Sequence, residues 1–232
     1  EHHRLSWLRG ASSIPSAASL ASFYGVLPYC AAHGIGGVNT LHCVPVFLMD
    51  TFAMALQATP YKVQLNITDT DLGVYENVRM TVARHPSETE ERLAVRLLAY
   101  ALWYHERLTF GRGLSDVDEP ALWLKTLDDR VEHWIEVGQP DADRMTWCSR
   151  RAEKVSVLVY GNTRVWISKQ LSAVASLANL NVAALPEEPL QALSTDLPRS
   201  IDWGVMISDG VLYVSDGDLQ HELPIEWLQG ER

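Results

Sequence analysis

The stretch His85-Pro86-Ser87-Glu88-Thr89-Glu90-Glu91-Arg92, followed by the apolar run Leu93–Trp103, predicts the cap and first turns of a long helix over residues 87–105. Pro86 keeps the preceding residue extended, and Ser87 with Glu90 three residues later has the spacing of a capping box. Two further acids, Glu88 and Glu91, then lie one turn apart. They either compensate the helix dipole, at about 0.3–1 kcal/mol each, or deliver a carboxylate to a metal site.

The apolar residues of this helix form a wide stripe, which predicts that the helix packs against a β-sheet. Glu91 stands four, seven and eleven residues before Val95, Leu98 and Leu102. Glu91 is therefore expected at the edge of the buried face, and it is the acid that exposure to solvent explains least.

Strands and helices are expected to alternate along the rest of the chain. We expect strands over 57–67, 77–83, 131–137, 154–160, 179–185, 201–207 and 211–214, further helices over 141–151 and 163–177, and a polar connection over 186–198. This order predicts an α/β domain in which a mixed β-sheet is flanked by helices. Within strand 131–137, His133 alternates with Val131 and Ile135, so it is expected to be a buried, hydrogen-bonded histidine rather than a ligand.

The composition narrows the classes of function. The chain has 232 residues and a formal net charge of -10, which argues against a broad nucleic-acid-binding or anionic-membrane surface but allows a local arginine cluster. Three widely spaced cysteines indicate no disulfide framework, and a cytoplasmic protein is expected. Proline and glycine interrupt every candidate membrane span, so no membrane partner is expected.

Residues 1–53 differ in composition from the remainder. Between Arg9 and Asp50 there is no Asp, Glu, Lys or Arg, and the segment is rich in Ser, Ala and Gly. We therefore expect residues 1–53 to be a poorly ordered or artefactual N-terminal extension, with a single α/β domain over residues 54–232.

Acidic residues from separate elements are candidates for a common site. Glu136 lies at the carboxyl end of strand 131–137, the position where α/β sheets form ligand sites. Asp118 (or Glu119) precedes another apolar stretch, and Glu88 or Glu91 begins the long helix. Two or three carboxylates with water would suit Mg²⁺ or Mn²⁺, and such a site would activate a water towards a phosphodiester.

Several blocks of sequence resemble the YaeQ family, in register from Met54 to the Asp209-Gly210 hairpin. These blocks are Ala83-Arg84-His85-Pro86-Ser87-Glu88-Thr89, Glu91-Arg92, Arg96-Leu97-Leu98-Ala99, Arg107-Leu108, Phe110, Arg112-Gly113-Leu114, Asp118-Glu119-Pro120 and Trp134-Ile135-Glu136-Val137-Gly138-Gln139-Pro140-Asp141. The resemblance implies a variant of the PD-(D/E)XK, restriction-endonuclease-like fold.

The pattern of that fold is a helix Glu, an Asp opening a strand, and an Asp/Glu-x-Lys on the next strand. Carried onto this chain, the resemblance implies Glu88 or Glu91 as the helix acid and Asp118 and Glu136 as the other metal ligands. The position of the lysine is occupied by Gly138. The neighbouring Gln139 is the candidate for orienting a water, although an amide carries no charge.

Two functions follow from this resemblance. The first is a Mg²⁺- or Mn²⁺-dependent nuclease in which Asp118, Glu136 and Gln139 act in catalysis. Phosphate would then be contacted by Arg84, Arg92 and Arg112, which flank the site in sequence. The second is a nuclease-like scaffold without catalytic activity that binds nucleic acid or a protein partner. The missing lysine and the acidic composition favour the second.

Overall fold

The computed structural model describes residues 57–112, 116 and 118–232. Contacts separate Ala55–Arg232 from the residues before it as one compact unit, and the fold described below is that of this unit. The predicted extension over residues 1–53 lies outside the described residues.

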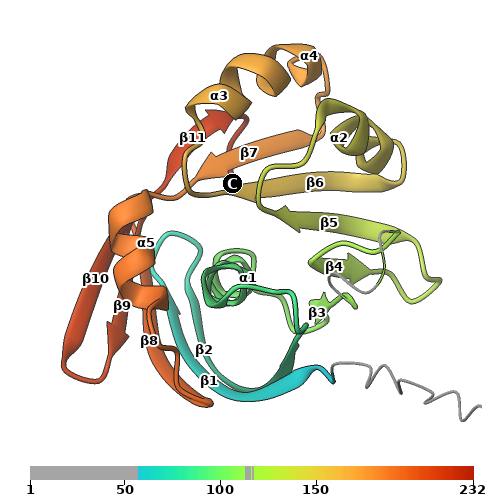
Figure 1. Ribbon diagram of the computed structural model, residues 1–232. Helices are drawn as coiled ribbons and strands as arrows, with labels where there is room; N and C mark the ends of the chain where they lie inside the picture. The colour runs from blue at the N-terminus through green and yellow to red at the C-terminus, as the bar shows by residue number, and fades with distance from the viewer. Residues whose placement is uncertain (1–56, 113–115, 117) are drawn as a thin grey trace, which may run out of the picture. The chain divides into compact units, whose positions relative to one another are not determined.

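The described strands form two mixed sheets rather than the single sheet expected from the sequence (Figure 1). The first sheet has the order β10-β9-β8-β1-β2, with β1 parallel to β8 and the other neighbours antiparallel. Its strands are β1 (Thr59–Asp69), β2 (Val74–Arg84), β8 (Ser200–Ser208), β9 (Val211–Asp216) and β10 (Leu219–Pro224).

The second sheet has the order β11-β7-β6-β5-β4-β3. Its central strands β5, β6 and β7 are parallel to one another, whereas β3, β4 and β11 pair antiparallel. The strands are β3 (Thr109–Phe110), β4 (Leu122–Lys125), β5 (Val131–Val137), β6 (Ala152–Val159), β7 (Leu180–Ala184) and β11 (Glu226–Gln229).

The helices are α1 (Glu90–Leu102), α2 (Ala142–Ser149), a helical segment made of α3 (Arg164–Trp166), the π-helical turn η2 (Ile167–Leu171) and α4 (Ser172–Val174), and α5 (Glu187–Ser194). The expected polar connection over 186–198 thus contains a helix. Leu190 and Leu193 of α5 are buried one turn apart, and two apolar positions were too weak a periodic signal to predict it.

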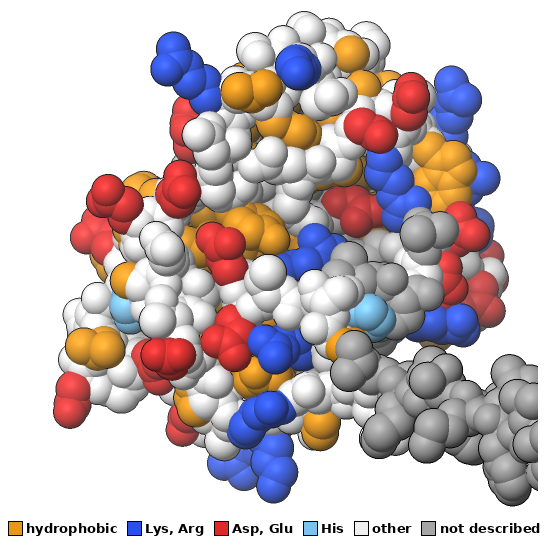
Figure 2. All heavy atoms as spheres, viewed as in Figure 1, with side chains coloured by type: hydrophobic (Ala, Val, Ile, Leu, Met, Phe, Trp, Pro, Cys, Tyr) orange, Lys and Arg blue, Asp and Glu red, His pale blue; other side chains and the backbone are white. Residues whose placement is uncertain are grey.

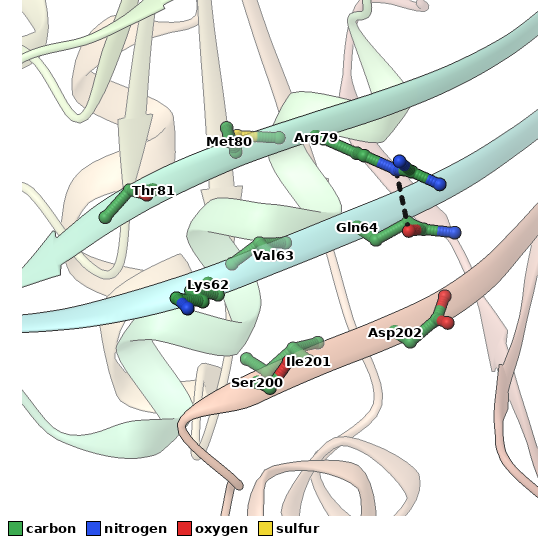
Figure 3. Close-up of a pocket in the computed structure, with 9 residues that line it drawn as sticks. All are labelled: Lys62, Val63, Gln64, Arg79, Met80, Thr81, Ser200, Ile201 and Asp202. Carbon is green, nitrogen blue, oxygen red and sulfur yellow. Dashed lines mark hydrogen bonds between the residues drawn. The ribbon is translucent and has the colours of Figure 1, made fainter.

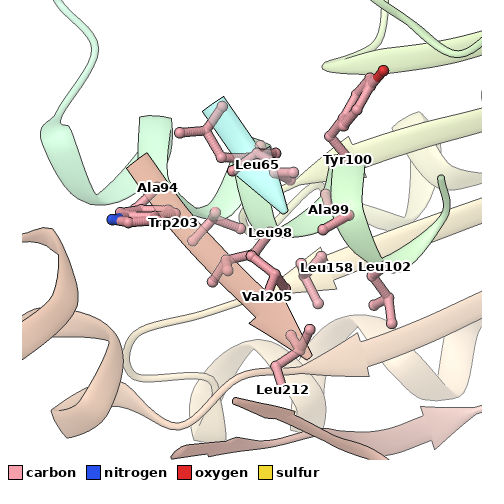
Figure 4. Packing of buried hydrophobic residues seen from close by; sticks show 14 of the residues in the cluster. Leu65, Ala94, Leu98, Ala99, Tyr100, Leu102, Leu158, Trp203, Val205 and Leu212 are labelled. Carbon is pink, nitrogen blue, oxygen red and sulfur yellow. The ribbon is translucent and has the colours of Figure 1, made fainter. Parts of the chain in front are cut away.

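Helix α1 is buried between the two sheets. Every residue from Leu93 to Leu102 is buried, so the helix has no solvent-exposed stripe along this length. Leu65, Trp203 and Val205 of the first sheet pack around it together with Leu158 of β6 in the second (Figure 4). The predicted packing of this helix against a sheet is confirmed, with a second sheet added on its other side.

A second core lies on the opposite face of the second sheet. There Trp134 of β5 packs with Met145 and Cys148 of α2 and with Val174 of α4. The second sheet is therefore covered on both faces, as is usual for parallel strands joined by helical crossovers. No helix among the described residues has the length and apolar character needed to cross a membrane.

The C-terminal residue ties α1 to the first sheet. The Arg232 guanidinium donates to Leu102 O, at 2.9 Å from Nε, and also pairs with Asp69. Asp69 is 1 % exposed, and it also accepts from the backbone N–H groups of Asp71 and Leu72. Arg232 thus compensates a buried carboxylate and satisfies a carbonyl at the end of α1.

We predict that Arg232→Ala destabilises the fold by about 1–3 kcal/mol, because Asp69 loses its counter-charge while it remains buried. Thermal and urea unfolding will measure the loss. Arg164→Ala, at an exposed position of α3, is the control and should unfold like the unchanged protein. Equal unfolding midpoints for Arg232→Ala and the unchanged protein would contradict this role.

Candidate functional site

The N-cap of α1 is Thr89, two residues later than the predicted cap. Its Oγ1 accepts a hydrogen bond from Arg92 N at 3.1 Å, as an N-cap side chain does. The Ser87 hydroxyl instead lies 2.7 Å from His85 Nδ1. Glu90 is not used in a capping box, because its carboxylate bonds to Arg84 and to the backbone N–H of Leu197. The predicted capping box was therefore wrong.

Glu88 lies in the interior. The residue is 5 % exposed, and Arg96 Nη1 lies 3.0 Å from each of its carboxylate oxygens. The backbone N–H of His85 donates to it at 3.2 Å, and Arg92 Nε lies 3.8 Å away. Since Arg96 is itself only 3 % exposed, these two charges form a buried ion pair.

Glu91 has a different environment from Glu88. Its pKa is raised, first by burial and then by the negative charge of Glu187 at the start of α5. Burial and a like charge thus both disfavour the ionised form of Glu91.

The alternation of β5 places Glu136 on the face of the sheet that is turned away from α1. Ile135 and Val137 belong to the core around α1, whereas Trp134 belongs to the core under α2. Residues that alternate along a strand point to opposite faces. Glu136 therefore points with Trp134 towards α2.

On that face Glu136 is held by Arg144 of α2. Its Oε1 accepts from Arg144 Nη2 at 2.7 Å, from Arg144 Nε at 3.0 Å and from Trp134 Nε1 at 2.9 Å. The Cys148 thiol lies 3.8 Å from the same oxygen, and burial followed by the charge of Glu136 raises the pKa of Cys148 to about 12. The thiol is thus protonated at neutral pH and unsuited to nucleophilic chemistry.

The loop before β4 holds the remaining predicted acid, Asp118. Its side chain is exposed, and its backbone N–H donates to Asp116 Oδ1 at 3.0 Å. The neighbouring Glu119 pairs with Arg112 at 3.5 Å, and the carbonyl of Glu119 accepts from Arg144 at 3.2 Å. This loop thus contacts α2, on the same side of the sheet as Glu136.

The predicted acids are divided between the two sides of the second sheet. Glu88 and Glu91 belong to the α1 side of the second sheet, and Glu136 belongs to the other side. Within residues 57–112, 116 and 118–232, no three His, Cys, Asp or Glu side chains form a group that could hold a metal ion. Because arginines already neutralise Glu88 and Glu136, this set of donors does not fit Mg²⁺ or Mn²⁺, which bind ionised oxygens.

Gly138 directly follows β5 and provides space for Arg92. It has a φ of +100°, and a Cβ at this position would lie 3.2 Å from Arg92 Nη1. Arg92 Nη1 donates to Val137 O at 2.7 Å, and the guanidinium also bonds the Tyr160 hydroxyl. A residue of α1 thus places a positive charge at this strand end.

Gln139 connects the ends of two strands. Its Nε2 donates to Tyr160 O at 2.9 Å and to Asn162 O at 3.2 Å. Both carbonyls follow β6, so the amide joins the loops after β5 and β6. The structure thus gives Gln139 a local structural contact, and its role at a water stays a prediction.

Each of the three predicted phosphate ligands has an acidic partner. Arg84 pairs with Glu90 at 3.2 Å and lies over the Tyr61 ring. Arg92 lies 3.8 Å from Glu88, and Arg112 lies 3.4 Å from Asp116. Arg92 is the one of the three that reaches the carboxyl end of β5.

Sequence reasoning missed the role of Arg96. The signal was present, because Arg96 is the single charged residue in the apolar run Leu93–Trp103. A charge in a buried helix requires a partner, and Glu88 precedes it by two helical turns. The prediction for His133 is confirmed: its Nε2 lies 2.8 Å from Ser156 Oγ, and burial lowers its pKa to about 3.

Glu88→Gln is predicted to lower stability and Glu91→Gln is not. Glu88→Gln leaves the buried Arg96 without its counter-charge and should cost about 3–5 kcal/mol. Glu91→Gln removes a charge that burial disfavours, so it should leave stability unchanged or raise it at neutral pH.

The pH dependence provides a second measurement. The pKa of Glu91 is raised in the folded state, so its contribution to stability is present at low pH and is lost as pH rises through that pKa. Thermal unfolding of Glu91→Gln between acid and neutral pH should lack this loss. Equal destabilisation by both substitutions would contradict the assigned environments.

Comparison with known proteins agrees with the resemblance seen in the sequence. The family model described as YaeQ protein matches residues 54–225. Proteins named "Uncharacterized protein YaeQ" are similar to the chain: one from Salmonella typhi is 37 % identical over 179 residues, covering 76 % of this chain and 99 % of the relative. Another, from Escherichia coli (strain K12), is 38 % identical over 165 residues, covering 70 % and 91 %.

Two crystal structures of YaeQ proteins are also similar. The protein from Pseudomonas syringae has 63 % sequence identity and a TM-score of 0.74, covering 75 % of this chain and 97 % of that one. The protein from Xanthomonas axonopodis pv. citri has 38 % identity and a TM-score of 0.73, covering 75 % and 99 %. The chain therefore belongs to the YaeQ family.

Proposed function

We propose that this YaeQ-family chain is a nucleic-acid-binding protein built on a restriction-endonuclease-like variant of the α/β fold. In this proposal Arg92 binds a phosphodiester at the carboxyl end of β5, and no divalent metal takes part. The observation that carries the proposal is the Arg92 guanidinium held beside Gly138.

The location of Arg92 supports ligand binding. Strands β5, β6 and β7 are parallel, and ligands of α/β sheets bind beyond the carboxyl ends of such strands. The loops after β5 and β6 begin with Gly138 and, one residue after Tyr160, Gly161, which both have positive φ. In Figure 2 the Lys and Arg side chains on this face are interspersed with Asp and Glu.

The chemistry of Arg92 suits a phosphate. A guanidinium presents a planar set of N–H donors that matches phosphate oxygens. The Tyr160 hydroxyl bonds the guanidinium, and burial raises the pKa of Tyr160. At neutral pH the phenol is therefore protonated, and it orients Arg92 without adding a negative charge that would repel the ligand.

The position of Glu136 argues against metal-dependent hydrolysis. A phosphate at Arg92 would lie on the α1 side of the sheet, whereas Glu136 points towards α2 and is neutralised by Arg144. A divalent ion would have to displace a 2.7 Å charge-assisted hydrogen bond at Glu136. The N–H donors of Arg92 therefore favour binding of a phosphodiester without its hydrolysis.

We predict that the protein binds fluorescently labelled oligonucleotides equally well with EDTA and with Mn²⁺, and does not cleave them. Anisotropy titrations and denaturing gels on single-stranded, duplex and branched substrates will measure this. Arg92→Gln should weaken binding about tenfold, because one charge-assisted contact is lost.

Arg164→Gln, at an exposed position of α3, is the matched control and should bind normally. Unfolding midpoints of both variants will separate lost binding from lost folding. Mn²⁺-dependent cleavage that Glu136→Gln abolishes would overturn the proposal in favour of a metal-dependent nuclease.

A further inference from the structure

A second positively charged feature lies on the outer face of the first sheet, away from α1. A hollow of about 540 Å³ opens there across β1, β2 and β8. Figure 3 shows Lys62, Arg79, Thr81 and Ser200 around it, with Asp202 at one end. Hydroxyl and cationic groups from three strands thus surround one open depression.

The cations of this hollow differ from most arginines of the fold. In the described part of the chain, eight arginines form ion pairs with acids: Arg84, Arg92, Arg96, Arg107, Arg112, Arg130, Arg144 and Arg232. Lys62 and Arg79 form none with any described residue, and both are exposed. Positive charge that the chain itself does not neutralise is available to an anionic ligand.

Arg79 is also held in place. Its Nε donates to Gln64 Oε1 at 2.9 Å, the bond drawn in Figure 3. This bond orients the guanidinium, and none of the described residues accepts a hydrogen bond from its two terminal nitrogens. Side chains fixed in this way lose less conformational entropy when a ligand binds.

The two cations lie on one face of the β1–β2 pair. Lys62 pairs with Thr81 and Gln64 pairs with Arg79 in the β1–β2 register, so the backbones of Lys62 and Arg79 are diagonal neighbours about 7–8 Å apart. Figure 3 shows the two side chains at opposite ends of the hollow. In Figure 2 blue side chains gather at the lower edge, where β1 and β8 lie in Figure 1.

We infer that this hollow binds the phosphodiester backbone of a nucleic acid, with Lys62 and Arg79 contacting phosphate and Thr81 and Ser200 donating hydroxyl hydrogen bonds. The inference rests on the proposed function and adds a second contact surface to it. An open depression on a sheet face suits a long polyanion better than a small anion, because it encloses no ligand and acts through several charges.

Asp202 is a lining residue whose removal should change the nucleic-acid affinity in the opposite direction from removal of Lys62 or Arg79. Its carboxylate accepts from Asn66 Nδ2 at 3.4 Å and forms no ion pair with a described residue. Its negative charge at the end of the hollow opposes a phosphate. Removing this charge should therefore strengthen binding, whereas removing Lys62 or Arg79 should weaken it.

The experiment measures oligonucleotide affinity by anisotropy over a range of salt concentrations. Lys62→Gln and Arg79→Gln should each weaken binding severalfold, and each should reduce the slope of log K against log salt by about 0.7–0.9, one phosphate contact. Asp202→Asn should strengthen binding. Lys169→Gln and Glu226→Gln, at exposed positions outside the hollow, are the matched controls and should leave the affinity unchanged.

The outcomes separate this inference from the proposed function. If the unchanged protein binds the oligonucleotide, and Lys62→Gln and Arg79→Gln bind it with the same affinity and salt slope, the inference about the hollow is overturned and the proposed function is not. If Asp202→Asn and Glu226→Gln raise the oligonucleotide affinity equally, the effect comes from net charge, and the inference about the hollow is again overturned. Displacement of the oligonucleotide by an equal concentration of inorganic phosphate would assign the hollow to a small anion. Absence of nucleic-acid binding by the unchanged protein overturns both proposals.

Discussion

The burial of α1 between two sheets is the constraint on which the rest of the structure depends. A helix without an exposed face can contain a charge only if that charge has a partner inside. Arg96 meets this condition through Glu88, and its Nη1 also lies 3.4 Å from Ala83 O at the end of β2. The pair thus joins the start of α1 to the first sheet, and Arg92, in the first turn of the same helix, reaches the second sheet.

The second core also contains a carboxylate whose charge is compensated by an arginine. Glu136 lies among Trp134, Cys148 and Arg144, and the guanidinium of Arg144 supplies the compensating charge. Among the described residues, the α1 side of the second sheet thus has the buried Glu88 paired with Arg96, and the α2 side has Glu136 paired with Arg144. An acidic chain that uses arginines in this way has fewer ionised oxygens available for a cation, although its sequence is rich in Asp and Glu.

The cationic groups that the two proposals use lie in two places. Arg92 is at the carboxyl end of β5, where it is held by a carbonyl and a phenol, and Lys62 and Arg79 are on the outer face of the first sheet. The net charge of -10 would repel a polyanion, so binding would depend on local positive charge of this kind. Local positive charge on a protein of negative net charge favours a few defined contacts with phosphate over non-specific binding of nucleic acid across the whole surface.

Local pattern was enough to predict much of the fold and the family. The alternation over Val131–Val137, the apolar run of α1 and the buried state of His133 are consequences of neighbouring residues, and the sequence by itself determined them. Alternation assigns Glu136 to the face opposite Ile135 and Val137, but it does not say which face α1 covers. Which face α1 covers depends on the pairing of β1 with β8, a strand far along the chain, because this pairing forms the other sheet that packs on the helix. The shift of the cap from Ser87 to Thr89 and the pairing of Glu88 with Arg96 have the same origin, because partners in three dimensions outweigh the spacing of a motif.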